Sequence, residues 1–288
     1  MRYCEYQPSA RLAPAVACVW TLEGHARDLD GAPQPILPDG RAEFVIHLGD
    51  AFARIDEGAM QRQPWAIFAG QLDRPLSLHP IGRVAVLGVR FRPEGAARFT
   101  RVPQRELVGQ TIDVALASAT LAEVARRVRD SAASLPDAAR LVQCLLDGVE
   151  RHEGPDHRVA SVVEAISRRG GRVSIERAAA DSGLSRRQLE RLFLRDVGLP
   201  PKQLARIVRF QRALRILDGG ARPARGIEAA YGGGYADQAH FIRDFREFAG
   251  CAPTEHLVSR AELTGLFTER PISRTPQASS RPQASSQT

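Results

Sequence analysis

The first 115 residues contain short apolar and alternating runs of the length that β-strands have. The clearest are residues 42–48, 65–68 and 84–91, and such runs are typical of strands that bury one or both faces. Turn-forming residues separate the runs, namely Pro38-Asp39-Gly40, Gly58, Gly70, Pro80 and Gly82. Short strands at this spacing predict an antiparallel β-rich barrel or sandwich over residues 1–115.

The pattern changes to a helical period between about Leu116 and Arg151. Two apolar stripes at helical spacing are separated by Pro136, the first formed by Leu121, Val124, Ala125 and Val128 and the second by Leu141, Leu145 and Val149. We expect residues 116–154 to form a helical connector that ends in a linker. The stripes fit either packing on the β-rich domain or pairing of subunits in a homodimer, and the pattern does not decide between these alternatives.

Residues 155–265 predict a separate all-α domain of about seven helices. Caps and stops mark the expected boundaries, in chain order Ser174, Gly183, Ser185, Pro201, Gly219 and Asp237. Ser185 and Gln188 have the spacing of a capping box, in which the two side chains satisfy each other's backbone amides. The predicted fold class is therefore α+β, with two domains of different composition.

One pattern occurs twice in this helical segment. Residues 183–201 and 234–253 each contain a glycine turn, a polar N-cap and a helix with one apolar and one basic face. With one residue inserted after the first glycine, the copies pair Leu189 with Phe241, Arg191 with Arg243, Phe193 with Phe245, Gly198 with Gly250 and Pro201 with Pro253. This is the layout of a helix-turn-helix, whose second helix enters the major groove of DNA. Two copies predict that one chain reads two grooves of double-stranded DNA.

The distribution of charge supports the same function. The chain of 288 residues carries a formal net charge of +7. Residues 156–260 hold 19 Arg and Lys against 12 Asp and Glu, whereas the remainder holds 21 of each sign. The whole excess of positive charge thus lies in the segment that contains the repeat, as expected of a domain that neutralises phosphates.

These residues resemble the C-terminal DNA-binding domain of AraC/XylS-type transcriptional regulators. The resemblance covers about residues 173–257 and is strongest at Gly-Leu-Ser-Arg-Arg-Gln-Leu-Glu-Arg-Leu-Phe (183–193) and Gly-Tyr-Ala-Asp-Gln-Ala-His-Phe-Ile-Arg-Asp-Phe-Arg (234–246). The closing Gly250-x-x-Pro253 also fits the family. The resemblance implies two recognition helices joined by a long helix, which enter successive major grooves about 34 Å apart.

The resemblance also assigns the DNA-binding residues. In the first copy the base-reading positions fall on Arg187 and Arg191, with Glu190 at a neighbouring contact position and Arg186 on the same outer face. In the second copy they fall on Gln238, Ala239 and Arg243, with His240 adjacent. Arginine pairs with guanine and glutamine with adenine, whereas Ala239 can at most touch a thymine methyl group. The alternatives are contacts to phosphates or a solvated face without DNA contact.

One segment departs from the family pattern. The helix before the second turn should carry a bulky apolar residue ahead of its alanine, but residues 226–234 contain the run Gly232-Gly233-Gly234. Each internal glycine costs a helix up to about 1 kcal/mol relative to alanine. We therefore expect the second unit to be less rigid than the first.

The N-terminal segment has its own resemblance, to a β-rich domain that precedes this DNA-binding unit in some bacterial regulators. It covers about residues 3–110, and the domain's ligand is uncharacterised. By analogy with better-known relatives, the domain binds a small effector or pairs subunits. The segment at residues 38–40 is most simply a turn, with a ligand role for Asp39, Arg41 or Glu43 as the alternative. His47 and His79 lack the spacing of a metal site, so we expect neither a metal nor another cofactor.

Two other functions fit part of the sequence. Some DNA-repair alkyl-transfer proteins carry the same DNA-binding unit beside a reactive cysteine held by zinc. Here Cys4 and Cys18 stand alone in their domain, whereas that chemistry requires a cluster that makes one thiol a thiolate. The glycine-rich segment leaves a β-rich small-molecule-binding protein with a degenerate DNA domain as the second alternative. We expect no enzymatic activity.

The remaining expectations concern location and partners. No run of about 18 apolar residues and no signal peptide are present, which predicts a cytoplasmic protein without membrane contact. RNA polymerase is a further candidate partner of a regulator. Residues 270–288 consist mostly of Pro, Ser, Gln and Arg and predict a disordered tail.

Overall fold

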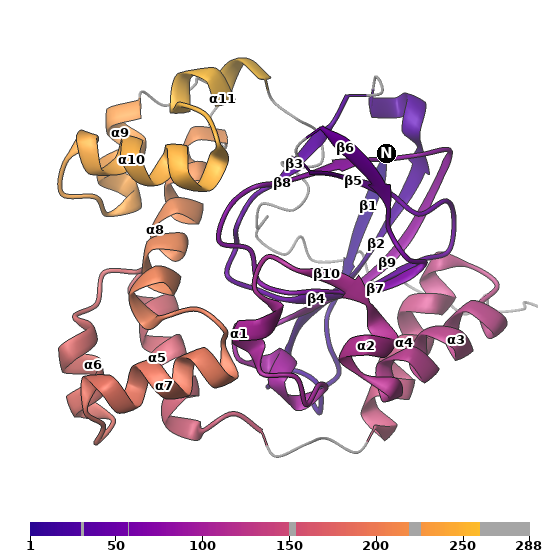
Figure 1. Cartoon of the computed structure of the whole chain (residues 1–288), viewed down its shortest axis with the longest axis horizontal. Helices are drawn as coiled ribbons and strands as arrows, with labels where there is room; N and C mark the ends of the chain where they lie inside the picture. The colour runs from indigo at the N-terminus through magenta and orange to yellow at the C-terminus, as the bar shows by residue number, and fades with distance from the viewer. Residues whose placement is uncertain (30–31, 57, 150–153, 219–225, 260–288) are drawn as a thin grey trace, which may run out of the picture.

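The structure is a computed structural model of the whole chain. It describes residues 1–29, 32–56, 58–149, 154–218 and 226–259. The predicted tail at residues 270–288 and the predicted helix stop at Gly219 lie outside the described residues. Two domains lie side by side, a β-rich N-terminal domain and a helical C-terminal domain (Figure 1).

The N-terminal domain consists of two antiparallel sheets. The six-stranded sheet has the order β1-β2-β9-β4-β7-β10 and the four-stranded sheet the order β3-β8-β5-β6. The strands are β1 (Arg2–Tyr6), β2 (Val16–His25), β3 (Gln34–Ile36), β4 (Glu43–His47), β5 (Ala53–Asp56), β6 (Ala59–Arg62), β7 (Ala66–Ala69), β8 (Leu76–His79), β9 (Arg83–Phe91) and β10 (Thr111–Asp113). The predicted antiparallel β-rich fold is confirmed, and among the described strands it takes the form of two sheets and not of one closed barrel.

The alternation along β4 explains why the six-stranded sheet has two buried faces. Phe44 and Ile46 point to a core that the following helices complete, whereas Val45 points to a second core between the two sheets. Successive side chains of a strand point to opposite faces, so Glu43 and His47 lie on the same side as Val45. The space between the sheets therefore receives one acidic and one imidazole side chain from this strand.

Short helical elements lie between the strands or directly after the last one, and two longer helices follow. The short elements are η1 (Ala26–Leu29), η2 (Gly95–Arg98), α1 (Gln104–Leu107) and α2 (Val114–Ala117). Helices α3 (Ala119–Ser131) and α4 (Leu135–Gly148) bury their apolar faces in the core of the six-stranded sheet. The first predicted stripe is buried as expected, but α4 buries Val142 and Leu146, while Leu141 and Leu145 are only partly buried. Both adjacent pairs are apolar, so helical period alone could not select between them.

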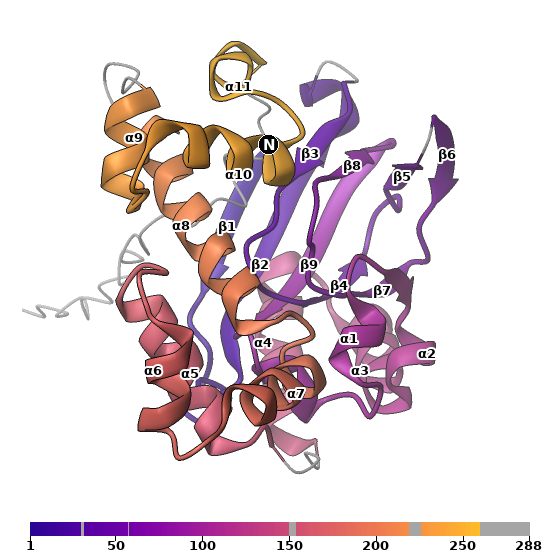
Figure 2. The same ribbon diagram turned by 60° about the vertical axis from the view of Figure 1, so that its left-hand side comes forward.

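Seven described helices form the C-terminal domain. They are α5 (His157–Arg168), α6 (Ile175–Asp181), α7 (Arg186–Asp196), α8 (Pro201–Asp218), α9 (Gly226–Gly233), α10 (Gln238–Ala249) and α11 (Pro253–Ser259). Helix α8 runs from the group α5–α7 to the group α9–α10 (Figure 2). It contributes Leu204 to the core of the first group and Phe210 and Leu214 to the core of the second. One helix therefore belongs to both helix-turn-helix units.

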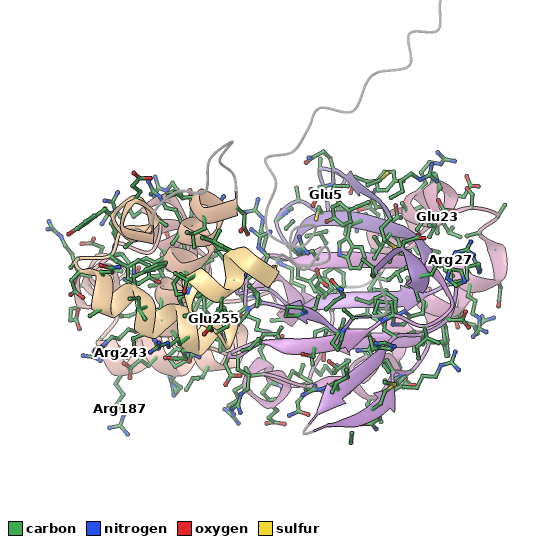
Figure 3. All side chains as sticks on the ribbon, turned by 90° about the horizontal axis from the view of Figure 1, so that it is seen from above. Glu5, Glu23, Arg27, Arg187, Arg243 and Glu255 are labelled. Carbon is green, nitrogen blue, oxygen red and sulfur yellow. The ribbon has the colours of Figure 1, made fainter. Side chains whose placement is uncertain are left out.

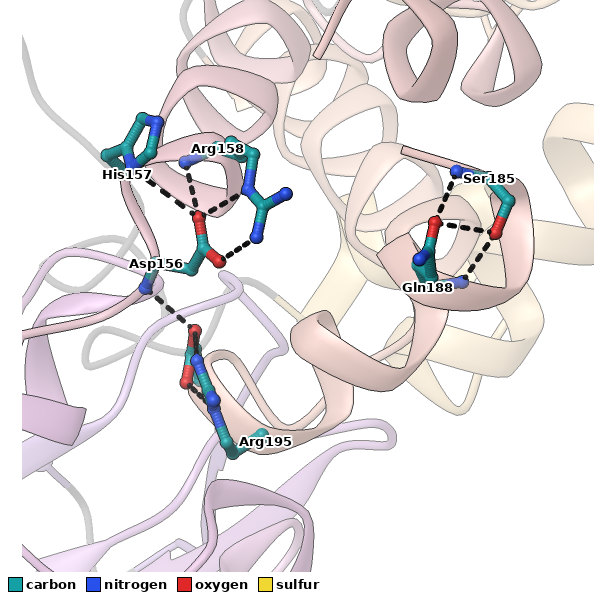
Figure 4. A network of polar contacts seen from close by, with 7 residues as sticks. Asp156, His157, Arg158, Ser185, Gln188 and Arg195 are labelled. Carbon is teal, nitrogen blue, oxygen red and sulfur yellow. Dashed lines mark hydrogen bonds and ion pairs between the residues drawn. The ribbon is translucent and has the colours of Figure 1, made fainter. Parts of the chain in front are cut away.

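The start of the helical domain is tied to α7 by polar contacts (Figure 4). The carboxylate of Asp156 caps α5 and accepts hydrogen bonds from Arg158. The backbone N–H of Asp156 donates to Oδ2 of Asp196 at 3.1 Å. Asp196 in turn pairs with Arg195 at 2.6 Å. The Arg158 guanidinium holds the pKa of Asp156 well below its usual range. These contacts fix the point at which the chain enters the first helix-turn-helix unit.

Candidate DNA-binding surface

The first unit consists of α6, a tight turn and α7. Gly183 adopts φ +66°, a left-handed conformation that favours glycine, and so reverses the chain between the helices. Ser185 then caps α7. Its backbone N–H donates to Gln188 Oε1 at 2.9 Å, and its hydroxyl accepts from the Gln188 backbone N–H at 3.3 Å (Figure 4). The predicted capping box is present and sets the first residue of the recognition helix.

The second unit repeats this design with α9 and α10. Gly234 adopts φ +95° at the position equivalent to Gly183. Asp237 is the N-cap, and its carboxylate accepts a hydrogen bond from the His240 backbone N–H at 2.7 Å. Both recognition helices therefore begin from a left-handed glycine and a polar cap.

The outer face of α7 separates its charged residues into two groups. Arg186 pairs with Glu190 at 3.0 Å and with Glu176 at 3.2 Å, so the structure places two of the predicted contact residues against each other. Arg187 and Arg191 are exposed, and neither has a hydrogen bond or ion pair within the described part of the chain. These two arginines are the side chains of α7 that are available for an external anion or base edge.

The outer face of α10 presents fewer polar groups. Gln238, Ala239 and Arg243 are exposed. His240 is half-buried, with its ring edge-on to Tyr235 at 5.3 Å and its Nε2 3.7 Å from Asp244. Its ring therefore packs partly against the protein, unlike the other three predicted contact residues of this helix.

The two arginine-bearing faces project from one side of the helical domain, where Arg187 and Arg243 point away from the protein (Figure 3). Helices α7 and α10 lie near opposite ends of α8 (Figure 1). The 18 residues of α8 span about 27 Å at 1.5 Å per residue. This length is close to one turn of DNA, about 34 Å, which separates successive major grooves on one side of the duplex.

A buried ion pair that was not predicted from the sequence fixes α10 on α8. Asp244 is 1% exposed, and its Oδ1 lies 2.7 Å from Nη2 of Arg206. The same Nη2 lies 2.6 Å from Oε2 of Glu247, and the guanidinium covers the ring of Phe248 at 5.0 Å. A sequence signal exists, because Asp244 falls on the apolar face formed by Phe241, Phe245 and Phe248. A charge on such a face indicates a buried partner.

The glycine-rich segment has a packing role. Residues 226–233 form a helix despite their glycines. A Cβ on Gly233 would lie 2.7 Å from Cβ of Ala213, and one on Gly232 would lie 2.6 Å from Cδ1 of Ile216. Both contacts are with α8. The glycines therefore permit a closer approach of α9 to α8. The described residues of each unit form an apolar core.

The cysteines do not form a reactive cluster. All four are free cysteines, and Cys18 is buried in the core between the sheets. Burial raises the pKa of the Cys18 thiol to about 12. A reactive thiolate needs a lowered pKa, so the environment of this residue disfavours the alkyl-transfer alternative. Among the described residues no group of three side chains could hold a metal ion.

In the described part of the chain, no helix combines the length and apolar character needed to cross a membrane.

Two family models match the chain. One, described as "Domain of unknown function (DUF6597)", matches residues 4–113, and the other, described as "Helix-turn-helix domain", matches residues 178–257. No protein of curated function matches. The first match agrees with the extent of the predicted N-terminal resemblance. The second begins within α6 and covers the rest of both helix-turn-helix units.

Several solved structures are similar to the chain. A probable AraC family transcriptional regulator from Rhodopseudomonas palustris is 36% identical over 37% of this chain and 98% of its own, with a TM-score of 0.33. A regulator with an AraC-type DNA-binding domain from Chromobacterium violaceum is 25% identical over 37% and 94%, with a TM-score of 0.33. ToxT from Vibrio cholerae, solved with an unsaturated fatty acid, is 11% identical over 88% and 96%, with a TM-score of 0.44. On its two helix-turn-helix units and its identity to the first of these regulators, the chain belongs to the AraC family of DNA-binding transcriptional regulators.

Proposed function

We propose that this chain is a cytoplasmic, non-enzymatic regulator that places α7 and α10 in two successive major grooves of its operator. The observation that carries the proposal is the presence of exposed arginines on both recognition helices, near the two ends of α8 (Figure 1). Within the described ranges Arg187, Arg191 and Arg243 have no hydrogen bond or ion pair. Arg191 and Arg243 are equivalent positions of the repeat. In this proposal they read guanine, as the fork of arginine does in the major groove.

The other predicted contact residues take supporting roles. Arg187 and Gln238 are exposed and reach base edges or phosphates, and Ala239 touches a thymine methyl group at most. Arg186 and Glu190 hold each other at 3.0 Å, so Arg186 contributes mainly charge toward the phosphate backbone. The His240 ring packs edge-on against Tyr235. We propose that its main role is to position α10 and that its contribution to DNA contact is smaller.

Other partners and the domain limits belong to the same proposal. We keep residues 1–115, 116–154 and 155–265 as the functional divisions of the chain. RNA polymerase is a proposed partner, as is a second copy of the chain. The stripes that could have paired subunits are largely buried against the six-stranded sheet. A homodimer would therefore have to use another surface.

The segment at residues 37–41 supports control by a small effector, because it contacts the helical domain directly. Leu37 packs in the core around Phe210, and Gln211 donates a buried hydrogen bond to the Pro38 carbonyl at 2.7 Å. A Cβ on Gly40 would lie 2.7 Å from Cδ1 of Leu204. The turn thus rests on α8, the helix that both DNA-binding units share.

The same segment borders a cavity in the β-rich domain. The cavity lies between the two sheets, has a volume of about 90 Å³, and is lined in part by Asp39 and Arg41. A molecule bound there would contact the turn that rests on α8. Such a ligand alters DNA affinity by its differential affinity for the two states, typically about 1–3 kcal/mol.

We expect Arg191→Ala or Arg243→Ala to cost about 1–3 kcal/mol of binding to the cognate operator, or about 5- to 150-fold. Each substitution should relax preference at one or two base pairs, because a base contact carries sequence information and a phosphate contact does not. The two affected positions should lie about one helical turn apart. Selection of bound sequences by each variant, followed by affinity measurement, checks this.

Arg127→Ala is the matched control, since Arg127 is an exposed arginine of α3 in the other domain. It removes the same charge and should change neither affinity nor sequence preference appreciably. If Arg191→Ala and Arg243→Ala weaken binding to all sequences equally, the two residues are phosphate contacts and the assignment of base reading is wrong.

A further inference from the structure

The cavity between the two sheets has an apolar wall and two polar ends. Strands β2, β4, β7 and β9 of one sheet and β3 and β8 of the other contribute to it. Val45, Ile67 and Val86 are among the apolar residues that line it. Glu43 and His47 stand at opposite ends of β4, about 13 Å apart along the strand. The cavity thus has an apolar middle part, and the polar groups at its two ends differ chemically.

His47 forms the first polar end. Its side chain is 3% exposed, and among the described residues neither ring nitrogen has a hydrogen-bond partner of normal geometry. Burial lowers the pKa of His47 to about 4, an effect that the neighbouring Gln63 side chain opposes. The ring is therefore neutral near pH 7, with one donor and one acceptor nitrogen. A buried polar group without a partner is unfavourable, and a bound hydroxyl or carbonyl group would relieve this.

At the second polar end of the cavity, charged side chains pair with one another. Arg90 is 3% exposed, and its Nε lies 2.7 Å from Oε1 of Glu43 and 3.7 Å from Oδ2 of Asp39. Trp20 donates a hydrogen bond to the same Glu43 oxygen at 3.2 Å. With Arg41, this end holds two basic and two acidic side chains. Their charges balance, so the cavity has no net charge to attract an anion or a cation.

From this arrangement, and resting on the proposed effector role of the domain, we infer that the cavity binds a small, uncharged, largely apolar molecule that carries one hydroxyl or carbonyl group, and that this group hydrogen-bonds to His47. The neutral imidazole supplies the polar contact, and the apolar wall supplies most of the buried area. A metal ion is a poorer occupant, since no group of three metal-ligating side chains occurs among the described residues.

A probe series tests the inference on the full chain. Phenol and benzyl alcohol represent the predicted class, toluene lacks the polar group, and benzoate and benzylamine carry a charge. A ligand that binds the folded state raises the melting temperature by mass action. We expect phenol and benzyl alcohol to raise it most at millimolar concentration, toluene less, and the charged compounds least. Calorimetry then gives the dissociation constants.

Substitution of His47 separates the polar contact from simple filling of the cavity. His47→Phe should weaken binding of phenol about tenfold, the size of one hydrogen bond, and leave toluene binding little changed. His47→Gln retains a donor and an acceptor and should restore much of the preference for phenol, and it guards against a fold defect in the phenylalanine variant. His79→Phe is the matched control, since His79 lies on β8 of the same domain but does not line the cavity.

Three results would overturn the inference. The first is that no uncharged probe raises the melting temperature, and the second is that benzoate or benzylamine binds as tightly as phenol. The third is that His47→Phe weakens binding of phenol and of toluene equally. DNA affinity of the same protein is measured in parallel. Loss of ligand binding with intact DNA binding refutes the cavity assignment alone, whereas ligand binding without DNA binding refutes the proposed regulatory function.

Discussion

The affinity of the full chain for DNA should fall about 10³-fold between 50 and 200 mM salt if about six phosphates are contacted. The physical reason is the release of counterions from DNA when arginines replace them. The excess of positive charge lies entirely within residues 156–260, with 19 basic against 12 acidic residues. Fluorescence anisotropy of labelled operator DNA over a series of salt concentrations measures the slope of log affinity against log salt.

Chloride and glutamate salts should give steep slopes of the same sign, since cation release from DNA dominates both. A neutral osmolyte at matched osmolality serves as the control and should not reproduce the loss. A folded protein whose DNA affinity stays constant across this salt range would contradict the assignment of a phosphate-neutralising domain. The same titration on Arg186→Ala should show a smaller slope, by about one unit, if this residue faces a phosphate.

The second large effect is expected for Arg206→Ala, which should lower the free energy of unfolding by about 3 kcal/mol. In the native protein Asp244 is 1% exposed and its Oδ1 lies 2.7 Å from Nη2 of Arg206. The substitution removes this cation from the buried carboxylate. A buried charge that loses its partner is strongly destabilising. Because the pair joins α10 to α8, operator binding should also fall. Urea denaturation monitored by circular dichroism measures the stability change.

Lys202→Ala provides the matched control, since Lys202 is an exposed cation of the same helix. It should change stability by less than about 0.5 kcal/mol. The double variant Arg206→Met with Asp244→Asn should recover much of the loss, because it removes the buried charge together with its partner. If the single and double variants are equally destabilised, the unpaired carboxylate is not the cause and the contact of Arg206 with Phe248 is the better explanation.

Local features of the sequence determined the DNA-binding half of this protein to a large degree. Ser185 and Asp237 cap their helices through contacts with residues three positions away, and such contacts need no information from the rest of the fold. The buried faces of α7 and α10 follow from helical period in the same way, since Leu189 and Phe241 recur at equivalent places. The exposed faces, and with them the predicted contact residues, follow by exclusion.

The hydrophobic period alone did not predict which side chains are buried in which core where adjacent positions are both apolar. The same holds where both faces of an element are buried. Helix α4 presents Leu141 beside Val142, and packing on the six-stranded sheet selects the second as the buried residue. Along β4 the apolar residues face two different cores, so the sequence predicted a strand without indicating which of its side chains would meet at a cavity.

The tertiary structure alone decided the contacts between segments distant in the chain. Arg206 meets Asp244 across 38 residues, and Gln211 meets Pro38 across 173. Each of these side chains had many chemically suitable partners in the sequence, and only the path of the chain brings one within reach. Helical period and capping depend on neighbours within a turn, whereas the link between the turn at residues 37–41 and α8 depends on how two independently patterned domains dock. Contacts between neighbouring residues therefore determined the two helix-turn-helix units, and domain docking decided how the β-rich cavity is connected to them.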